Sequence, residues 1–428
     1  MADDLRDELK TPNLNLASPE QLLSALKGIG LNLPNTSKET LSAIPHPIAA
    51  LVVKYRGLVG LCNTMQGWLK CLDSSNRLYP PLNPLGADTG RFSCKKPNLL
   101  ATPRDSEIRC CLIPDDGFAL IEADFSNIEM RIAAWFAREE RMLAIFRDGG
   151  DIHGETAALV LGDRQARQPA KPINFGCLYG GGAERLRITA RTDYGIEFSS
   201  EQARRHHNQV FTIYRGLPRW HRSAKASAPG LTYGTTPYGR RRWADPADSK
   251  DAWNWNRFQL ATNFPVQGTG ADAIKLALVR LHRELAGTDA RILLQVHDSI
   301  LVQAPRESAH AVKDLVRQAM CGAFYEILGP DFPVAVNTSH LRAVGAEKLI
   351  HAQSTPYSRR RVGQRSKSDH PHPTRTRHIA GSVLLNAAPP GDNSHGVQLA
   401  PGRTKATQFR RHQDSKSMMA SLTSLSAA

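Results

Sequence analysis

Apolar residues recur at helical spacing in several stretches of the chain. A helix is expected to begin at Ser18, because the letters SPEQ have the form of a capping box with proline in the first turn. Residues 46–72 and 127–142 predict two further helices, and residues 150–230 are mostly helical in pattern. Another helix is expected to begin near Gly268, with apolar residues along one face. The chain is therefore rich in helix.

Shorter apolar runs with polar ends predict strands. Residues 118–123 read FALIEA and lead directly into Asp124. Residues 291–303 hold two apolar runs on either side of His297 and Asp298, which predicts two strands that meet at a polar corner. Residues 231–243 also predict a hairpin. Two aspartates are thus expected at strand ends, where a carboxylate is well placed to bind a metal ion.

The composition divides the chain at about residue 346. The formal net charge is +15, and residues 351–428 contain 12 Lys and Arg against 3 Asp and Glu, so +9 of the excess lies there. That segment has few aromatic residues and no sustained periodicity, so it is expected to be disordered. The remaining +6 is a mild excess that suits a polyanionic partner without requiring one.

Cysteine usage and hydropathy exclude several classes of protein. The seven cysteines are scattered and form no C-x-x-C pair, which argues against a disulfide framework or a zinc site and fits a reducing compartment. The first residues, MADDLRDELK, do not resemble a signal peptide. No run of about 18 apolar residues is present, so no transmembrane helix is expected.

A third segment adds phosphate chemistry to the two aspartates. Arg167, Lys171 and Phe175 are spaced at i, i+4 and i+8, which places them on one face of a helix with Tyr179 at its margin. Two cations and two rings on one face suit a triphosphate with a base stacked beside it. The alternative is a solvated amphipathic helix, and each aspartate alone is most often a turn former or helix cap.

Taken together, these segments resemble DNA polymerase family A. Motif A of that family corresponds to the segment from Asp124 to Arg131, motif B to Arg167-x3-Lys171-x3-Phe175-x2-Leu178-Tyr179-Gly180, and motif C to His297-Asp298. Four further blocks agree in type and order: TGRFS at 89–93, DIH at 151–153, GRRRW at 239–243 and NFPVQGTGAD at 263–272. The resemblance covers roughly residues 13–345.

The resemblance implies an α+β fold of the right-hand polymerase type. Its antiparallel-sheet palm would comprise residues 76–135 and 246–345, with motif A in the first part and motif C in the second. The mostly helical fingers would be residues 136–245, a partial helical thumb residues 1–75, and a basic tail residues 346–428. Only about 75 residues precede the palm, so most of the thumb and the whole proofreading exonuclease domain are expected to be missing.

The implied reaction joins a dNTP to a primer 3′-hydroxyl on template DNA. Asp124 and Asp298 would bridge two Mg²⁺ ions, for which Mn²⁺ is a substitute, and the carbonyl of Phe125 would be a third ligand. Two divalent ions can stabilise the attacking and leaving oxygens of such a displacement together. This role requires the strands of the two aspartates to be adjacent in one sheet.

The resemblance also implies contacts to the substrates. Lys171, Arg167 and His153 would hold the phosphates, and Lys171 would protonate the leaving pyrophosphate. Around the sugar and base, the implied set is Phe175, Tyr179, Glu129 and Asn127. Phe175 would discriminate against dideoxynucleotides, and Glu129 would exclude a 2′-hydroxyl. For DNA, the implied set is Arg91, Asn263, Gln267 and His297; Arg91 and Gln267 would read minor-groove acceptors that all base pairs share.

Three positions depart from the family pattern. Pro172 follows Lys171, and proline disfavours a helical residue before it. If the helix starts at Pro169, Pro172 lies in its first turn and Arg167 lies in the loop before it. Asn127 replaces the usual glutamine. Ser299 stands where the DNA polymerases usually have glutamate, and His-Asp-Ser is expected in single-subunit phage RNA polymerases.

Two alternatives follow from these departures. An RNA polymerase must leave room for a 2′-hydroxyl, and Glu129 and Phe175 argue against it. A truncated, non-catalytic DNA-binding remnant is the other alternative, against which stand the intact aspartates, Lys171 and Glu129. The favoured interpretation is a DNA polymerase of low processivity in a bacterial or phage-infected cell, in the cytoplasm at the nucleoid. It would act away from membranes, and a separate exonuclease or processivity partner is not identified.

Overall fold

The computed structural model describes residues 1–341, except 43, 103–105 and 249–253, together with residues 383–385. These residues form two compact units. The first contains residues 1–70, 133–231 and 247–263, and the second contains residues 71–132, 232–246 and the chain from 264 onward. The chain therefore passes between the units several times, and each unit is described by itself.

The first unit begins with four helices, α1 (Ala2–Glu8), α2 (Pro19–Gly28), α3 (Lys38–Ser42) and α4 (Pro47–Leu69). The Ser18 side chain accepts a hydrogen bond from the Gln21 N–H, so the helix start expected there is confirmed. Leucines of the first three helices and of the segment between α1 and α2 form the core of this part, together with apolar residues from the N-terminal half of α4. The length and composition of α4 are also those of a membrane-spanning helix, although its N-terminal residues Ile48, Ala49 and Val52 are buried in that core.

The rest of the first unit is also helical. It contains the end of α6 (Ile128–Ala137), then α7 (Glu140–Arg147), α8 (Ile152–Thr156), a π-helical turn (Ala157–Leu161), α9 (Arg167–Leu178), α10 (Ala183–Tyr194), α11 (Ser200–Ile213) and α12 (Gly216–Ser227). The single helix expected over 127–142 is divided into α6 and α7. Glu139 causes the division, because its side chain accepts the Arg141 N–H at 3.2 Å and so caps α7.

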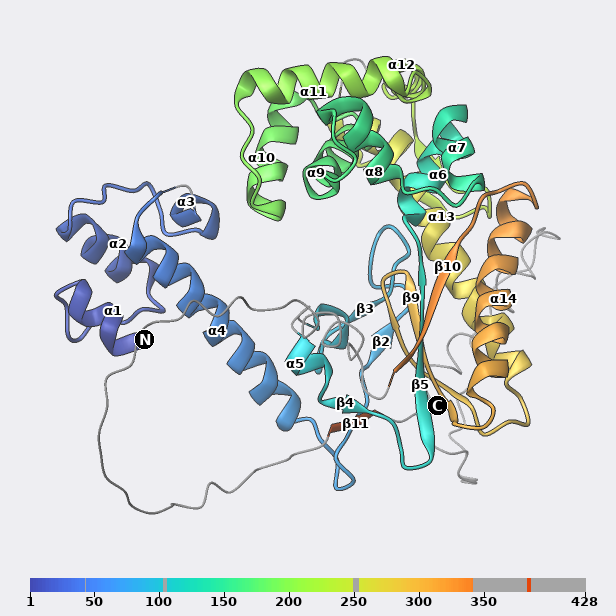
Figure 1. Cartoon of the computed structure of the whole chain (residues 1–428), viewed down its shortest axis with the longest axis horizontal. Helices are drawn as coiled ribbons and strands as arrows, with labels where there is room; N and C mark the ends of the chain where they lie inside the picture. Colours follow the sequence, from blue (N-terminus) through green and yellow to red (C-terminus); the bar gives the residue numbers. More distant parts are fainter. Residues whose placement is uncertain (43, 103–105, 249–253, 342–382, 386–428) are drawn as a thin grey trace, which may run out of the picture. The chain divides into compact units, whose positions relative to one another are not determined.

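The second unit is built on an antiparallel sheet of four strands in the order β10-β5-β9-β8. These are β5 (Phe118–Phe125), β8 (Arg291–Val296), β9 (Ser299–Pro305) and β10 (Val336–Leu341). Figure 1 labels β5, β9 and β10 of this sheet. Helix α14 (Ala309–Leu328) packs against β5, β9 and β10, and the Phe125 and Phe324 rings meet edge to face at 4.9 Å. The strand expected over 118–123 and the hairpin over 291–303 are confirmed, and the fold is mixed α+β.

A long helix, α13 (Trp255–Glu284), precedes the sheet's second hairpin. It begins well before the expected start near Gly268, and Pro265 lies inside it. Pro265 and the two glycines of NFPVQGTG disfavour a continuous helix, yet Val266 and Phe264 are fully buried, so packing overrides the local preference. The hairpin expected over 231–243 is confirmed as β6 (Tyr233–Thr235) and β7 (Arg241–Trp243).

Short elements complete the second unit. They are β1 (Arg77–Leu78), β2 (Leu82–Asn83), β3 (Ser93–Cys94), β4 (Leu112–Ile113), a 3-10 turn (Leu99–Ala101) and α5 (Ser106–Arg109). Strand β11 (Val383–Leu385) pairs in parallel with β1 and β4. Apart from β11, the tail expected from residue 346 onward lies outside the described residues.

Candidate active site

Asp124 and Asp298 are brought together by the pairing of β5 with β9. Asp124 lies directly opposite Ser299 in this antiparallel pair, and the Phe125 N–H donates to the Asp298 carbonyl at 3.2 Å. His297 and Asp298 form the tight turn between β8 and β9, where His297 has a left-handed φ of 56°. The expectation that the strands of the two aspartates are adjacent in one sheet is confirmed, with Asp124 on β5 and Asp298 in the turn that leads into β9, 174 residues further along the chain.

The surroundings of Asp298 suit a bound cation. Burial raises the pKa of this carboxyl, and the negative charge of Glu129 raises it further. A nearby cation would offset both effects, because it stabilises the charged form. Within the described residues no group of three or more His, Cys, Asp or Glu forms a metal cage. Mg²⁺ does not need one, since it keeps several waters and binds through one or two carboxylates together with substrate phosphates.

Glu129 lies in the first turn of α6, close behind the end of β5. Its carboxylate forms an ion pair with the Arg91 guanidinium, which comes from the segment between β2 and β3. Asn127, between β5 and α6, has a left-handed φ of 51°, a conformation that asparagine tolerates better than most residues. The end of the central β5–β9 pair, where the aspartates lie, is thus also the place where Arg91 and Glu129 meet.

Asn263 and Gln267 are four residues apart on α13, so they lie on the same face of this helix. Both side chains are partly exposed. The Oδ1 atom of Asn263 is buried and has no hydrogen-bond partner among the described residues. An unsatisfied amide oxygen is costly when buried, so this atom is a candidate for contact with a ligand.

The first unit holds the other candidate group, on α9. Arg167, Lys171 and Phe175 follow one another along this helix at i, i+4 and i+8. The helix begins at Arg167 and not at Pro169, so Pro172 lies in its interior. Arg167 is therefore part of the helix, and its Nε donates to Asp151 Oδ2 at 2.6 Å.

His153 lies behind this helix in a buried position. It is 2% exposed, and its Nδ1 is 3.0 Å from Asn174 Nδ2. Its ring centroid lies 5.7 Å from that of Phe175. Burial, with the positive charge of Arg167 as a further cause, lowers the pKa of His153 to about 4. The imidazole is therefore neutral at physiological pH and supports Asn174 and Phe175 from behind.

Several polar residues near these groups were not expected from the sequence. Asp151 and Asn174 contact the α9 group, and Asp272 and Lys275 are buried on α13. An aspartate and a lysine three residues apart in the otherwise apolar stretch 271–279 of α13 could have indicated the second pair. The partners of such residues come from distant segments, which periodicity does not identify.

Comparisons with known proteins agree with the pattern of motifs. The family model described as DNA polymerase family A matches residues 3–341. DNA polymerase I of Aquifex aeolicus is 34% identical over 340 residues, which are 75% of this chain and 57% of that protein. DNA polymerase I of Deinococcus radiodurans is 38% identical over 293 residues, 64% of this chain and 30% of that protein.

A solved structure is also similar, the POL domain of Pol1 from M. smegmatis in complex with DNA primer-template and dNTP. Its TM-score is 0.71 at 28% sequence identity, and the match covers 81% of this chain and 64% of that chain. The thermostable DNA polymerase I of Thermus aquaticus is 34% identical over 68% of this chain and 36% of its own length. The chain thus spans between about a third and three fifths of these curated relatives.

Proposed function

Because the chain belongs to DNA polymerase family A, we propose that it extends a DNA primer along a template by adding dNTPs to the 3′-hydroxyl. The observation that carries this proposal is the juxtaposition of Asp124 and Asp298 at the place where β5 ends and β9 begins. Two carboxylates held by adjacent strands are the donor set that a two-metal nucleotidyl transfer requires.

In this proposal the parts of the chain have the roles of a right-hand polymerase. The β10-β5-β9-β8 sheet with α13 and α14 is the palm, formed from residues 76–135 and 246–345. Residues 136–245 are the proposed fingers, and residues 1–75 are the proposed thumb part. In this proposal the chain acts in the cytoplasm of its cell.

Asp124, Asp298 and the Phe125 carbonyl are the proposed ligands of two Mg²⁺ ions. When bound, these ions stabilise the negative charge on the attacking and leaving oxygens. Asp298 contributes a carboxylate whose charge is partly desolvated, because the residue is only partly exposed and this burial raises its pKa. Its affinity for a cation is therefore greater than that of an exposed aspartate.

Arg167 and Lys171 are the proposed triphosphate ligands. Arg167 is paired with Asp151 at 2.6 Å, so it is already held at the start of α9 and exchanges this carboxylate for phosphate when the nucleotide binds. Lys171 is the proposed proton donor to the leaving pyrophosphate. For His153, burial and a neutral ring favour a supporting role behind Phe175 over a direct phosphate contact.

Glu129 and Phe175 are the proposed sugar-selecting residues, with Tyr179 and Asn127 beside them. The ion pair with Arg91 holds the Glu129 carboxylate in one place, as a steric block to a 2′-hydroxyl requires. Arg91, Asn263, Gln267 and His297 are the proposed DNA contacts. This set favours DNA synthesis over RNA synthesis.

A primer-extension assay with dNTPs or rNTPs tests the proposal. We expect the wild-type chain with Mg²⁺ to extend a primed template with dNTPs in preference to rNTPs. Asp298→Ala should lower the extension rate by a hundred-fold or more, roughly the cost of removing a preorganised charge stabiliser. Asp116→Ala, at the opposite and exposed end of β5, is the matched control and should retain wild-type rates.

Three results would contradict the proposal. Equal extension by Asp298→Ala and the wild type would remove Asp298 from the reaction. A preference for rNTPs would favour the RNA polymerase alternative. Primer-template binding without extension would indicate a non-catalytic DNA-binding protein.

A further inference from the structure

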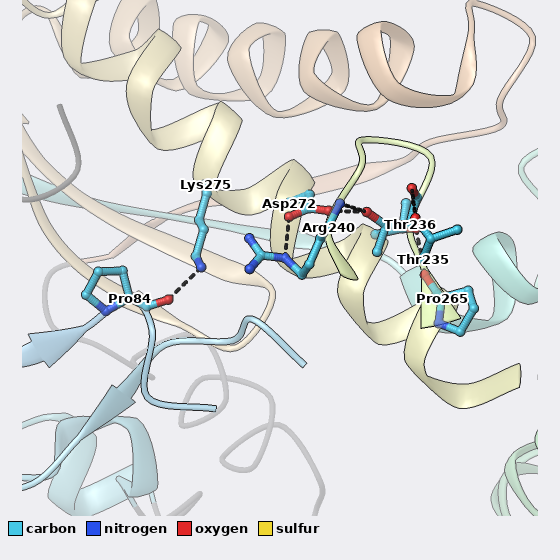
Figure 2. Close-up of polar contacts among 8 residues, drawn as sticks. Pro84, Thr235, Thr236, Arg240, Pro265, Asp272 and Lys275 are labelled. Atoms are coloured by element: carbon cyan, nitrogen blue, oxygen red, sulfur yellow. Dashed lines mark hydrogen bonds and ion pairs between the residues drawn. The ribbon is translucent and has the colours of Figure 1, made fainter. Parts of the chain in front are cut away.

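Two charged side chains are buried on α13, away from the aspartates, and a third, partly exposed one packs against them. Lys275 is 0% exposed and Asp272 1% exposed, and the Arg240 side chain is 18% exposed. Asp272 accepts from Arg240 Nε at 2.7 Å and from the Thr236 hydroxyl at 2.6 Å, as Figure 2 shows. Burying charges is expensive unless each is paired, so such a group calls for a specific reason.

Lys275 contacts the segment that carries Arg91 at two points. Its Nζ donates to the Pro84 carbonyl at 2.6 Å (Figure 2), and it lies over the Phe92 ring at 5.4 Å from the centroid. Pro84 precedes Arg91 by seven residues, and Phe92 follows it directly. The buried Lys275 ammonium group therefore contacts the chain both before and after Arg91.

Arg240 packs against the residue on the other side of Arg91. Gly90 has a left-handed φ of 82°, and a Cβ atom built on it would lie 2.6 Å from Arg240 Nε. Only glycine leaves room for the guanidinium at this position. Asp272 fixes this guanidinium, so Gly90 and Phe92, the two neighbours of Arg91, each rest against a cation that α13 holds.

We propose that Lys275 is a positioning residue, which sets the place of Arg91 by fixing the loop 84–92 to α13. This inference rests on the proposed function, in which Arg91 contacts a minor-groove acceptor at the primer end. The same helix carries Gln267 two turns earlier, so α13 would set both minor-groove contacts through one rigid element. A misplaced Arg91 would impair alignment of the primer end while leaving binding of the incoming nucleotide intact.

Single-nucleotide incorporation by Lys275→Met tests the inference. The substitution keeps an unbranched apolar side chain and removes the ammonium group. We expect kcat to fall by roughly ten-fold, the effect of weakening one charge-assisted hydrogen bond, with KM for the dNTP unchanged. On a primer that ends in 3-deazaguanine, which lacks the minor-groove N3 acceptor, the variant and wild type should differ by less than about two-fold.

Hydrogen exchange of the loop provides a readout that does not depend on activity. Amides in residues 84–92 should exchange faster in Lys275→Met, while amides of β5 and β9 should keep wild-type protection. Phe92→Leu, which removes only the ring under Lys275, should give the same pattern in a milder form. Arg283→Met, at an exposed position on the same helix, is the matched control and should change neither kcat nor exchange.

The outcomes separate the two proposals. Equal losses on the natural and 3-deazaguanine primers, or unchanged protection of residues 84–92, would overturn the positioning role. If the wild type extends neither primer, the polymerase proposal fails, and the exchange of residues 84–92 alone decides whether Lys275 holds the loop. Faster exchange across the whole sheet would mean that Lys275 serves general stability, which also overturns the inference.

Discussion

At the scale of single residues, Ser299 shows how a departure from a family pattern can be accommodated. Its hydroxyl donates to the Val296 carbonyl at 3.0 Å, which closes the turn that holds Asp298. It also lies opposite Asp124 in the β5–β9 pair, and residues opposite each other in an antiparallel pair project from the same face. Position 299 is therefore close to the proposed cation site.

This placement gives a prediction for Ser299→Glu. A carboxylate there adds about 1 kcal/mol or more of attraction to a divalent ion, so we expect Mn²⁺ to bind about five- to ten-fold more tightly. Calorimetric titration with Mn²⁺ measures this without any turnover. Ala311→Glu, at an exposed position of α14, is the control of equal charge. Unchanged binding in Ser299→Glu would place residue 299 outside the cation site.

Lys275 gives a second prediction at this scale, on pH. Burial, with Arg240 as the next cause, lowers the pKa of Lys275 from 10.5 to about 8. Between these values the unfolded chain binds more protons than the folded one, so the contribution of this lysine to the free energy of unfolding rises with pH. The stability of the wild type relative to Lys275→Met should be constant below pH 8 and then increase by up to about 3 kcal/mol towards pH 10.5.

Urea unfolding of both proteins at several pH values measures this difference. Other groups also titrate in this range, but they are common to the two proteins and cancel in the comparison. A difference that is constant across pH 8–10.5 would show that Lys275 keeps its ordinary pKa in the folded chain.

The sequence predicted some of these residues and not others, for a physical reason. Asp124, Lys171 and Asp298 stand at positions where the local pattern already places a polar group at a strand end or on a helix face. Asp272 and Lys275 have the opposite setting, because they interrupt the apolar stretch 271–279 of α13 and their partners Arg240 and Pro84 come from other segments. Local patterns do not contain such pairings.

At the scale of elements, α13 and α9 both contain prolines that the local sequence presents as breaks. Pro172 lies inside α9 and Pro265 inside α13. An interior proline removes one hydrogen bond of the helix, and here the buried neighbours Ile173 and Val266 offset that loss through packing. The existence of each helix was predictable, whereas its starting residue was set by tertiary packing.

The ion pair between α13 and the β6–β7 hairpin gives a prediction for this scale. Asp272→Ala leaves the Arg240 guanidinium and the Thr236 hydroxyl without their shared acceptor. Removal of one partner from a buried pair costs roughly 3–5 kcal/mol, so the free energy of unfolding should fall by about that amount in a urea titration. Asp314→Ala, which breaks the exposed pair with Arg317, should cost less than about 1 kcal/mol. Equal losses in the two variants would contradict the prediction.

At the scale of the whole molecule, each of the two compact units is formed from three separate segments of the chain. The order of motifs along the sequence was sufficient to identify the family and the mixed α+β fold. The same motifs also predicted that the strands of Asp124 and Asp298 are adjacent in the sheet. The division of α13 between the two units was not predictable, because the sequence of a continuous helix does not show at which residue its packing partners change.

Because of the strand order β10-β5-β9-β8, strand β5 is synthesised long before the two strands that pair with it. Strand β5 ends at Phe125, and its two neighbours begin at Ser299 and Val336, so 211 residues separate it from the second of them. At about 5–20 residues per second, both edges of this buried strand wait roughly 10–40 s for their partners. Unpaired apolar strand edges favour association between chains. The arrangement that unites Asp124 with Asp298 therefore exposes each nascent chain to aggregation during translation, and chaperones that shield β5 should raise the yield of folded protein.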